Sequence, residues 1–69
     1  MNEISLTVNG ERRTLSAAAT LAEVVAELSG ANTGVAAALN EAVVPRGSWP
    51  ATALAEGDRI EILTAVQGG

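Results

Sequence analysis

The residues with the clearest chemical potential lie at the end of the sequence, which reads Gln67-Gly68-Gly69. The two glycines lack a Cβ, so they make a narrow segment that adopts backbone conformations closed to other residues. Such a segment can enter a channel too tight for side chains and present the Gly69 carboxylate inside another protein. From Val66 onward the extended reach is about 13 Å at ~3.3 Å per residue. We therefore expect residues 67–69 to be a flexible tail with Gly69 as its reactive residue.

The rest of the sequence offers little chemistry of its own. It has 69 residues, enough for one domain, and contains neither cysteine nor histidine. A disulfide, a thiolate nucleophile and a zinc site are therefore excluded, and the commonest general acid–base side chain is missing. The large apolar side chains are three Ile, seven Leu, seven Val, one Met and one Trp, too few to enclose a substrate cavity. These features argue against an enzyme, and we expect no bound cofactor or metal.

The net charge of −4 limits the partners of this protein. Nucleic acid and anionic membranes are both negatively charged, so neither is expected to bind it. The charge instead suits a soluble protein with a basic protein partner. The sequence has no basic signal-peptide start and no apolar run long enough to span a bilayer, so we expect a cytoplasmic location.

The first part of the sequence predicts a hairpin followed by a helix. Apolar and polar residues alternate over 4–8, Asn9-Gly10 favours a type I′ turn, and residues 11–15 return as an arginine-bearing edge strand. Thr20 and Glu23 have the spacing of a capping box. The helix that follows has an apolar stripe of helical period, made of Leu21, Val24, Val25 and Leu28, with Gly30 closing the helix.

The second part predicts further strands at 35–39, 42–44 and 59–66, with turns between them. Residues 46–50 are expected to be irregular and 51–55 to form a helical turn. A hairpin, a helix across its face and more strands, with the last strand in mid-sheet, is the β-grasp arrangement. The predicted class is therefore α+β, with one helix packed across one face of a mixed sheet. The right-handed crossover rule predicts that the strand after the helix, or the final one, runs parallel to the first.

The final strand leads directly to the glycine pair. If Ile60 and Ile62 face the core, Leu63 faces outward, because successive side chains of a strand alternate between faces. An exposed leucine beside the tail is a candidate contact surface for a partner. We expect residues 1–66 to form the β-grasp domain that presents the tail.

Several stretches match a known pattern when they are taken together. They are Asn40-Glu41, Val43-Val44-Pro45-Arg46 with Trp49 three residues on, the run Glu56-Gly57-Asp58-Arg59-Ile60-Glu61-Ile62, and the ending Val66-Gln67-Gly68-Gly69. These stretches resemble the ThiS family, the sulfur carrier proteins of bacterial thiamine biosynthesis, which have a ubiquitin-like fold. The glycine pair and the turn near Gly57 are shared more widely, and the segment from Val43 to Trp49 is the part that favours ThiS.

The resemblance implies a carrier cycle centred on Gly69. An E1-like adenylating enzyme of the ThiF type would use ATP and magnesium to convert the carboxylate into an acyl adenylate. A sulfur donor, ultimately the persulfide of a cysteine desulfurase, would displace AMP and leave a thiocarboxylate, whose sulfur thiazole synthase would take. Gly68, Gln67 and Val66 would be held by backbone hydrogen bonds, much as an added strand is recognised, with Leu63 as a further partner contact.

Other functions remain open from the residues alone. The same thiocarboxylate chemistry could serve molybdopterin synthesis or another sulfur acceptor. A β-grasp interaction module with incidental terminal glycines would look similar in composition and pattern. A small enzyme is the least favoured reading, because a pocket and a base are both missing.

Overall fold

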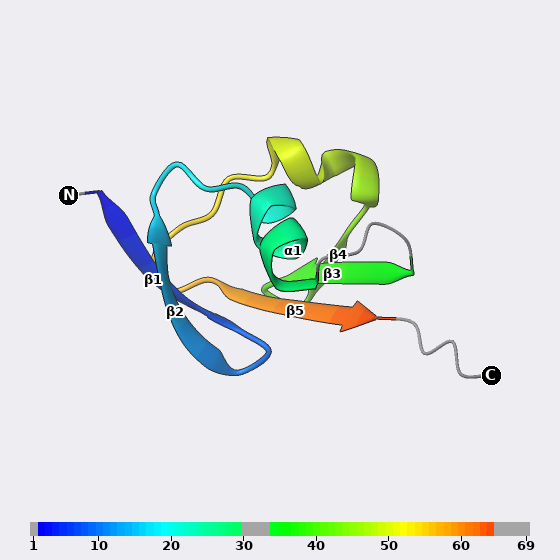
Figure 1. Ribbon diagram of the computed structural model, residues 1–69, viewed down its shortest axis with the longest axis horizontal. Coiled ribbons are helices and arrows are strands. Elements are labelled where there is room, and N and C mark those ends of the chain that lie inside the picture. The colour runs from blue at the N-terminus through cyan, green and yellow to red at the C-terminus, as the bar shows by residue number, and fades with distance from the viewer. Residues whose placement is uncertain (1, 30–33, 65–69) are drawn as a thin grey trace.

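The computed structural model describes residues 2–29 and 34–64 (Figure 1). Its elements are, in order, β1 (Glu3–Val8), β2 (Glu11–Ser16), α1 (Leu21–Ser29), β3 (Val35–Leu39), β4 (Ala42–Val44), the 3₁₀ helix η1 (Arg46–Ala51) and β5 (Arg59–Thr64). The strands form one sheet in the order β2-β1-β5-β3-β4. β5 lies in the middle, parallel to β1 and antiparallel to β3. This is the predicted β-grasp arrangement, and the final strand is the one that runs parallel to the first.

Both hairpins turn through residues with positive φ. Asn9 and Gly10, with φ of 53° and 84°, connect β1 to β2, which confirms the predicted type I′ geometry. Asn40 and Glu41, with φ of 51° and 73°, connect β3 to β4 in a similar turn. Asparagine tolerates this region better than most residues, because its short side chain bonds locally to the backbone. The two turns place an asparagine side chain on each side of β5.

The start of α1 is held by the predicted capping box. The Glu23 N–H donates to Thr20 Oγ1 at 3.4 Å, and the Thr20 N–H donates to Glu23 Oε1 at 3.2 Å. These bonds satisfy donors that a helix terminus otherwise leaves unpaired. Within the helical stripe Leu21, Val24 and Val25 are buried, whereas Leu28 at the far end is 37% exposed. The helix therefore packs firmly at its start and leaves an apolar margin near its end.

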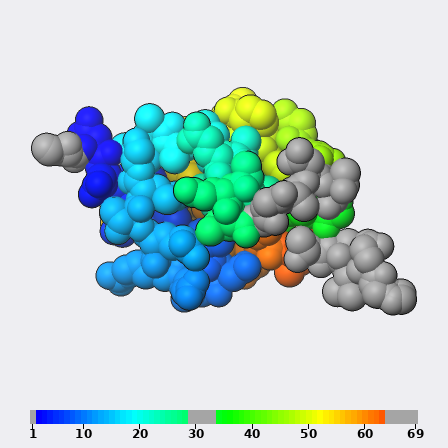
Figure 2. Space-filling model, in the orientation of Figure 1, coloured from blue at the N-terminus to red at the C-terminus, as the bar shows by residue number. Residues whose placement is uncertain are grey.

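The core lies between the sheet and the two helical segments. Its buried members are Leu6, Val8, Leu21, Val24, Val25, Ala37, Trp49, Leu54, Ile60 and Ile62. Figure 2 shows the β1–β2 hairpin in blue, α1 in cyan to green and η1 in yellow-green on the viewed face, with a small orange area of β5. The strand that leads to the tail is thus covered by segments distant from it in sequence.

The segment before β5 differs from its prediction. Residues 46–50, predicted to be irregular, form most of η1, and the helical turn predicted at 51–55 is absent there. The buried Trp49 indole explains the shift, because its Nε1–H donates to the Val44 carbonyl oxygen at 2.8 Å and winds the chain tightly after β4. Ala53 instead forms a β-bridge with Thr20.

Three predicted boundaries fall outside the described residues. β5 is described as far as Thr64, and the predicted continuation to Val66 lies beyond it. The predicted division between a domain of residues 1–66 and a tail of 67–69 also lies there, as does Gly30. These remain predictions from the sequence.

The capping box predicts the effect of a single substitution. Thr20→Ala removes the hydroxyl acceptor and is expected to lower the free energy of unfolding by roughly 1 kcal/mol, as for other N-cap threonines. Thr20→Ser keeps the acceptor and serves as the matched control. Urea unfolding monitored by circular dichroism measures both variants. An unchanged midpoint for Thr20→Ala would refute the stabilising role of the cap.

Candidate functional site

The strand leading to the tail is fixed at the centre of the sheet. The Ile60 side chain is fully buried and Ile62 is buried beside it, so one face of β5 is anchored in the core. The tail residues predicted to act, Val66, Gln67, Gly68 and Gly69, lie outside the described residues. The structure defines β5, the strand that precedes these residues in the sequence.

The Asn9 side chain binds the backbone of β5 where β1 has ended. Its Nδ2–H donates to the Ile62 carbonyl oxygen at 3.2 Å, and the Ile62 N–H donates to its Oδ1 at 2.8 Å. A carboxamide presents an N–H donor and a C=O acceptor in one plane, as a peptide group does. Asn9 therefore replaces a missing strand neighbour and extends the pairing of β5 on that side.

Asn40 performs a related task at the start of β5. The side-chain Oδ1 of Asn40 accepts from the Arg59 N–H at 2.9 Å, and the backbone N–H of Asn40 donates to the Arg59 carbonyl oxygen at 2.7 Å. Its Nδ2–H donates to Asp58 Oδ1 at 3.1 Å, while the other Asp58 oxygen accepts from the Ala55 N–H at 2.8 Å. These bonds fix the turn before β5 and the first residue of the strand.

Sequence reasoning assigned Asn9 and Asn40 only to turns. The structure shows that each positive-φ turn also aims a carboxamide at β5. The signal available in the sequence was asparagine rather than glycine at the first turn position, since glycine meets the φ requirement without offering a hydrogen-bonding group. The bonding partners could not be read from the sequence because they lie 53 and 19 residues away.

Beyond Ile62, β5 has a described strand partner on one side only. Leu63 and Thr64 pair with Ala36 and Val35 of β3. The pairing of β5 with β1 stops at Ile60, and the Asn9 side chain covers Ile62. At its end, β5 therefore has one backbone edge that pairs with no strand among the described residues.

The sheet face opposite α1 carries exposed apolar side chains near this end of β5. Leu63 is 69% exposed, which confirms its predicted outward orientation, and Val43 of β4 is 78% exposed. Register places Leu63 opposite Ala36, and Val43 opposite Ala38. We call these four residues the open-face patch. Val43 was not predicted as a site residue. Its position between Ala42 and Val44 in a short strand, where side chains alternate between faces, could have predicted its exposure.

Two other kinds of site, a metal-binding cluster and a membrane-spanning helix, are absent from the part of the chain that the structure describes. Residues 2–29 and 34–64 contain no group of three or more acidic side chains close enough to hold a metal ion. No helix within the same residues has the length and apolarity needed to cross a bilayer. The features that bear on the predicted tail are the fixed strand β5, its open edge and the open-face patch.

A β-grasp domain whose final strand lies at mid-sheet and precedes a glycine pair in the sequence belongs to the ubiquitin-like class. Within that class, the chain belongs to the ThiS family, whose model matches residues 6–69. A crystal structure of the thiamine biosynthesis protein ThiS from Geobacter metallireducens is similar, with a TM-score of 0.77 and 32% identity over 96% of this chain and 100% of that one.

A longer protein is also similar to this chain. A thiazole synthase from Paramagnetospirillum magneticum is 35% identical over 66 residues, which cover 96% of this chain and 20% of that protein. The chain therefore spans about a fifth of the length of the curated relative that it matches.

The Asn9 contact predicts a loss of stability that is separate from turn strain. Asn9→Gly keeps a residue that accepts positive φ but removes both bonds to Ile62, so unfolding is expected to become easier by roughly 1–3 kcal/mol. Asn2→Gly, at an exposed position outside the strands, is the control. Urea unfolding gives the free energy, and hydrogen exchange at the Ile62 amide reports the local contact. Wild-type exchange at Ile62 in Asn9→Gly would contradict this role.

Proposed function

We propose that this protein is a sulfur carrier of thiamine biosynthesis, with the Gly69 carboxylate as its carrier group. The observation that carries the proposal is the match to the ThiS family across residues 6–69, a range that includes the terminal glycine pair. In this role the protein is a co-substrate of other enzymes rather than a catalyst. Its reactions would take place in the cytoplasm.

The proposed chemistry activates the carboxylate before sulfur is added. A carboxylate oxygen of Gly69 attacks the α-phosphorus of ATP on a ThiF-type enzyme, with magnesium bound there, and pyrophosphate leaves. The terminal sulfur of a cysteine persulfide then forms a C–S bond as the bond to AMP breaks. A thiol then attacks the cysteine sulfur of the S–S bond and forms a disulfide with that cysteine. The other sulfur stays on the Gly69 carbonyl carbon as the thiocarboxylate. Its sulfur is a far better nucleophile than a carboxylate oxygen.

The geometry of β5 supports delivery of the tail into a partner. The core and the two asparagine side chains fix the strand as far as Ile62, so the position of its end is well defined relative to the domain surface. An extended partner segment can pair with the open backbone edge beyond Ile62 and continue along Val66, Gln67 and Gly68, as in strand addition. The domain then remains outside while the glycine pair reaches the reacting centre.

The open-face patch is the proposed docking surface for these partners. Leu63 and Val43 are both large, apolar and exposed, and Leu63 lies within the strand that continues toward the tail. Burying such side chains on a partner supplies affinity close to the reactive end. The adenylating enzyme and thiazole synthase would use this surface in turn, since each must take up the same tail.

The similarity to a thiazole synthase supports that enzyme as the sulfur acceptor. In that relative, a stretch similar to this chain makes up about a fifth of one longer protein. Covalent attachment of a carrier to its acceptor raises the effective concentration of one for the other. A carrier that serves molybdopterin synthesis instead would not account for this relative.

The first prediction is a mass change at the tail. Incubation of this protein with a ThiF-type enzyme, ATP, magnesium, a cysteine desulfurase, cysteine and a thiol reductant is expected to add the mass difference between sulfur and oxygen. Intact-mass and peptide mass spectrometry would locate the gain in the C-terminal peptide. Thiazole synthase is then expected to remove the sulfur, and the large subunit of molybdopterin synthase is the comparison acceptor. No gain with a partner active on its own carrier would overturn the proposal.

A second prediction concerns the open-face patch. Leu63→Asp is expected to slow thiocarboxylate formation by about tenfold or more at limiting partner concentration, because losing one buried leucine contact costs about 1.5 kcal/mol or more. Ala26→Asp, which adds the same charge on the exposed side of α1, is the control. The initial rate of mass conversion measures both. A wild-type rate for Leu63→Asp would remove the patch from the docking surface.

A third prediction concerns the width of the tail. Gly69→Ala is expected to fold normally, with an unchanged unfolding midpoint, and to lose most of its sulfur transfer because a methyl group obstructs a narrow channel. Mass spectrometry and urea unfolding separate the two effects. Sulfur acceptance at the wild-type rate would show that the channel is not narrow at this position.

A further inference from the structure

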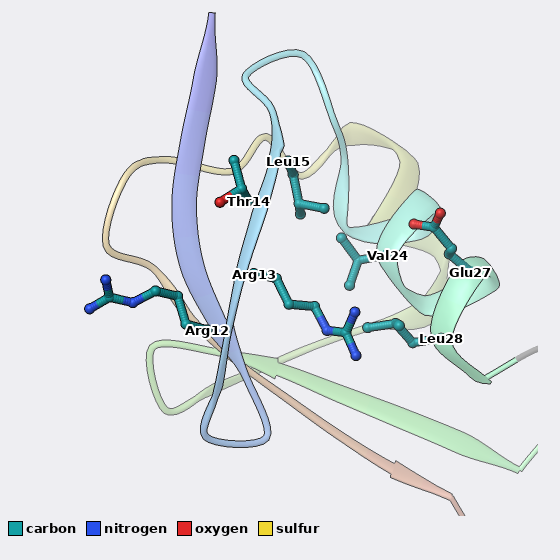
Figure 3. A pocket seen from close by; sticks show the side chains of 7 residues that line it. All are labelled: Arg12, Arg13, Thr14, Leu15, Val24, Glu27 and Leu28. Carbon is teal, nitrogen blue, oxygen red and sulfur yellow. The ribbon is translucent and has the colours of Figure 1, made fainter.

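A second surface lies between the edge strand β2 and α1, on the helix side of the sheet. Figure 3 shows this groove, and its volume is about 370 Å³. It is lined by Arg12, Arg13, Thr14 and Leu15 of β2 and by Val24, Glu27 and Leu28 of α1. Leu15, Val24 and the half-exposed Leu28 make its base apolar. None of these residues belongs to the open-face patch.

The backbone of β2 presents unpaired groups along this groove. Ser5 and Thr7 of β1 direct their N–H groups away from β2, toward Glu56 and the Asp58 carbonyl oxygen. Backbone groups alternate in direction along a strand, so β1 pairs with β2 through the residues between them. In that register Arg12 and Thr14 direct their N–H and C=O groups outward, where no described strand lies.

The edge strand carries two adjacent arginines on a protein that is negative overall, with Glu11 next to them in β2 and Glu27 on the facing helix. Arg12 and Arg13 are two of the four basic side chains in a chain of net charge −4. Figure 3 shows Arg13 extending toward Leu28 on the helix side and Arg12 extending to the other side of β2. Arg13 pairs with Glu11 at 3.4 Å, but the Glu11 side chain is 77% exposed, so this contact is weak and easily exchanged.

We propose that this β2–α1 groove binds an extended acidic segment of a partner protein, which adds to β2 as an antiparallel strand. Antiparallel addition is preferred because its hydrogen bonds are slightly more stable per residue than parallel ones. The outward groups of Arg12 and Thr14 supply main-chain bonds, the apolar base takes one side chain, and the two arginines attract acidic residues.

The register of β2 specifies the order of residues in the partner segment. A residue opposite Leu15 faces the apolar base, and the residue opposite Arg13 lies on the same face two positions on. The residue opposite Arg12 lies on the other face. From its N-terminus, the bound segment therefore reads apolar, any residue, acidic, acidic. Glu27 lies across the groove from Arg13 and weakens the attraction for acidic groups on the helix side.

The test uses the acetylated and amidated peptide Thr-Val-Thr-Val-Thr-Asp-Asp-Ser with the full-length ¹⁵N-labelled protein. The expected result is a saturable shift of the Arg12, Thr14 and Leu28 amide signals, with slower hydrogen exchange at Arg12 and Thr14. A peptide with Lys at both Asp positions is expected to bind at least tenfold more weakly. No saturable shift, or equal binding of the two peptides, overturns the proposal.

Variants of the protein test each part of the contact. Arg13→Glu is expected to weaken peptide binding at least tenfold, whereas Arg46→Glu, the same charge change on η1, leaves it unchanged. Glu27→Gln is expected to strengthen it. Thr14→Pro removes one outward donor at an edge position that tolerates proline, and is expected to abolish binding where Thr14→Ala does not.

The variant results also distinguish this site from the carrier function. Arg13→Glu keeps the tail and the open-face patch, so its conversion to the thiocarboxylate is expected to proceed at the wild-type rate. Wild-type peptide affinity in Arg13→Glu, or shifts confined to the open-face patch, would overturn the groove. If Thr14→Pro fails to fold, the Arg13→Glu and Arg46→Glu pair still decides the outcome.

Discussion

The backbone of β5 is the element on which the rest of the structure depends. It joins two hairpins that otherwise share no strand pairing, and its inward side chains complete the core beneath α1. Where neighbouring strands end, the carboxamides of Asn9 and Asn40 continue the bonding. A strand held by burial on one face and by amide groups at its edges leaves little freedom in where its last residue lies.

The two faces of the sheet have different tasks because they carry different side chains. The helix face holds the large buried residues, whereas the open face carries alanines with Leu63 and Val43 exposed among them. Ala36 and Ala38 are small, so Leu63 and Val43 stand out on this face beside the exposed Arg59 and Glu61 of β5. At the sheet margin, Leu28 in the last turn of α1 is 37% exposed, and the core borders a groove there. The core and both candidate contact surfaces thus follow from one distribution of side-chain sizes.

Patterns between residues close in sequence predicted most of this fold. The first hairpin, the Thr20–Glu23 cap and the strand at Val35–Leu39 each depend on a few adjacent residues, and the structure contains all of them. The η1 position was predicted wrongly because the Trp49 bond to Val44 is not visible in local propensity. The glycine pair could be singled out from the sequence alone, and its reactivity stays a prediction. The asparagine contacts to β5 could not be predicted, because they join residues brought together only by folding.

The central place of β5 has a consequence for biosynthesis. The chain is made from its N-terminus, so both hairpins and α1 are synthesised before residues 59–64 exist to join them. Until then the two hairpins have no shared strand, and the contacts that link Asn9 to Ile62 span 53 residues. The domain therefore closes only when synthesis has nearly reached the glycine pair. A chain that has not reached residue 59 therefore lacks both the closed sheet and Leu63 of the open-face patch.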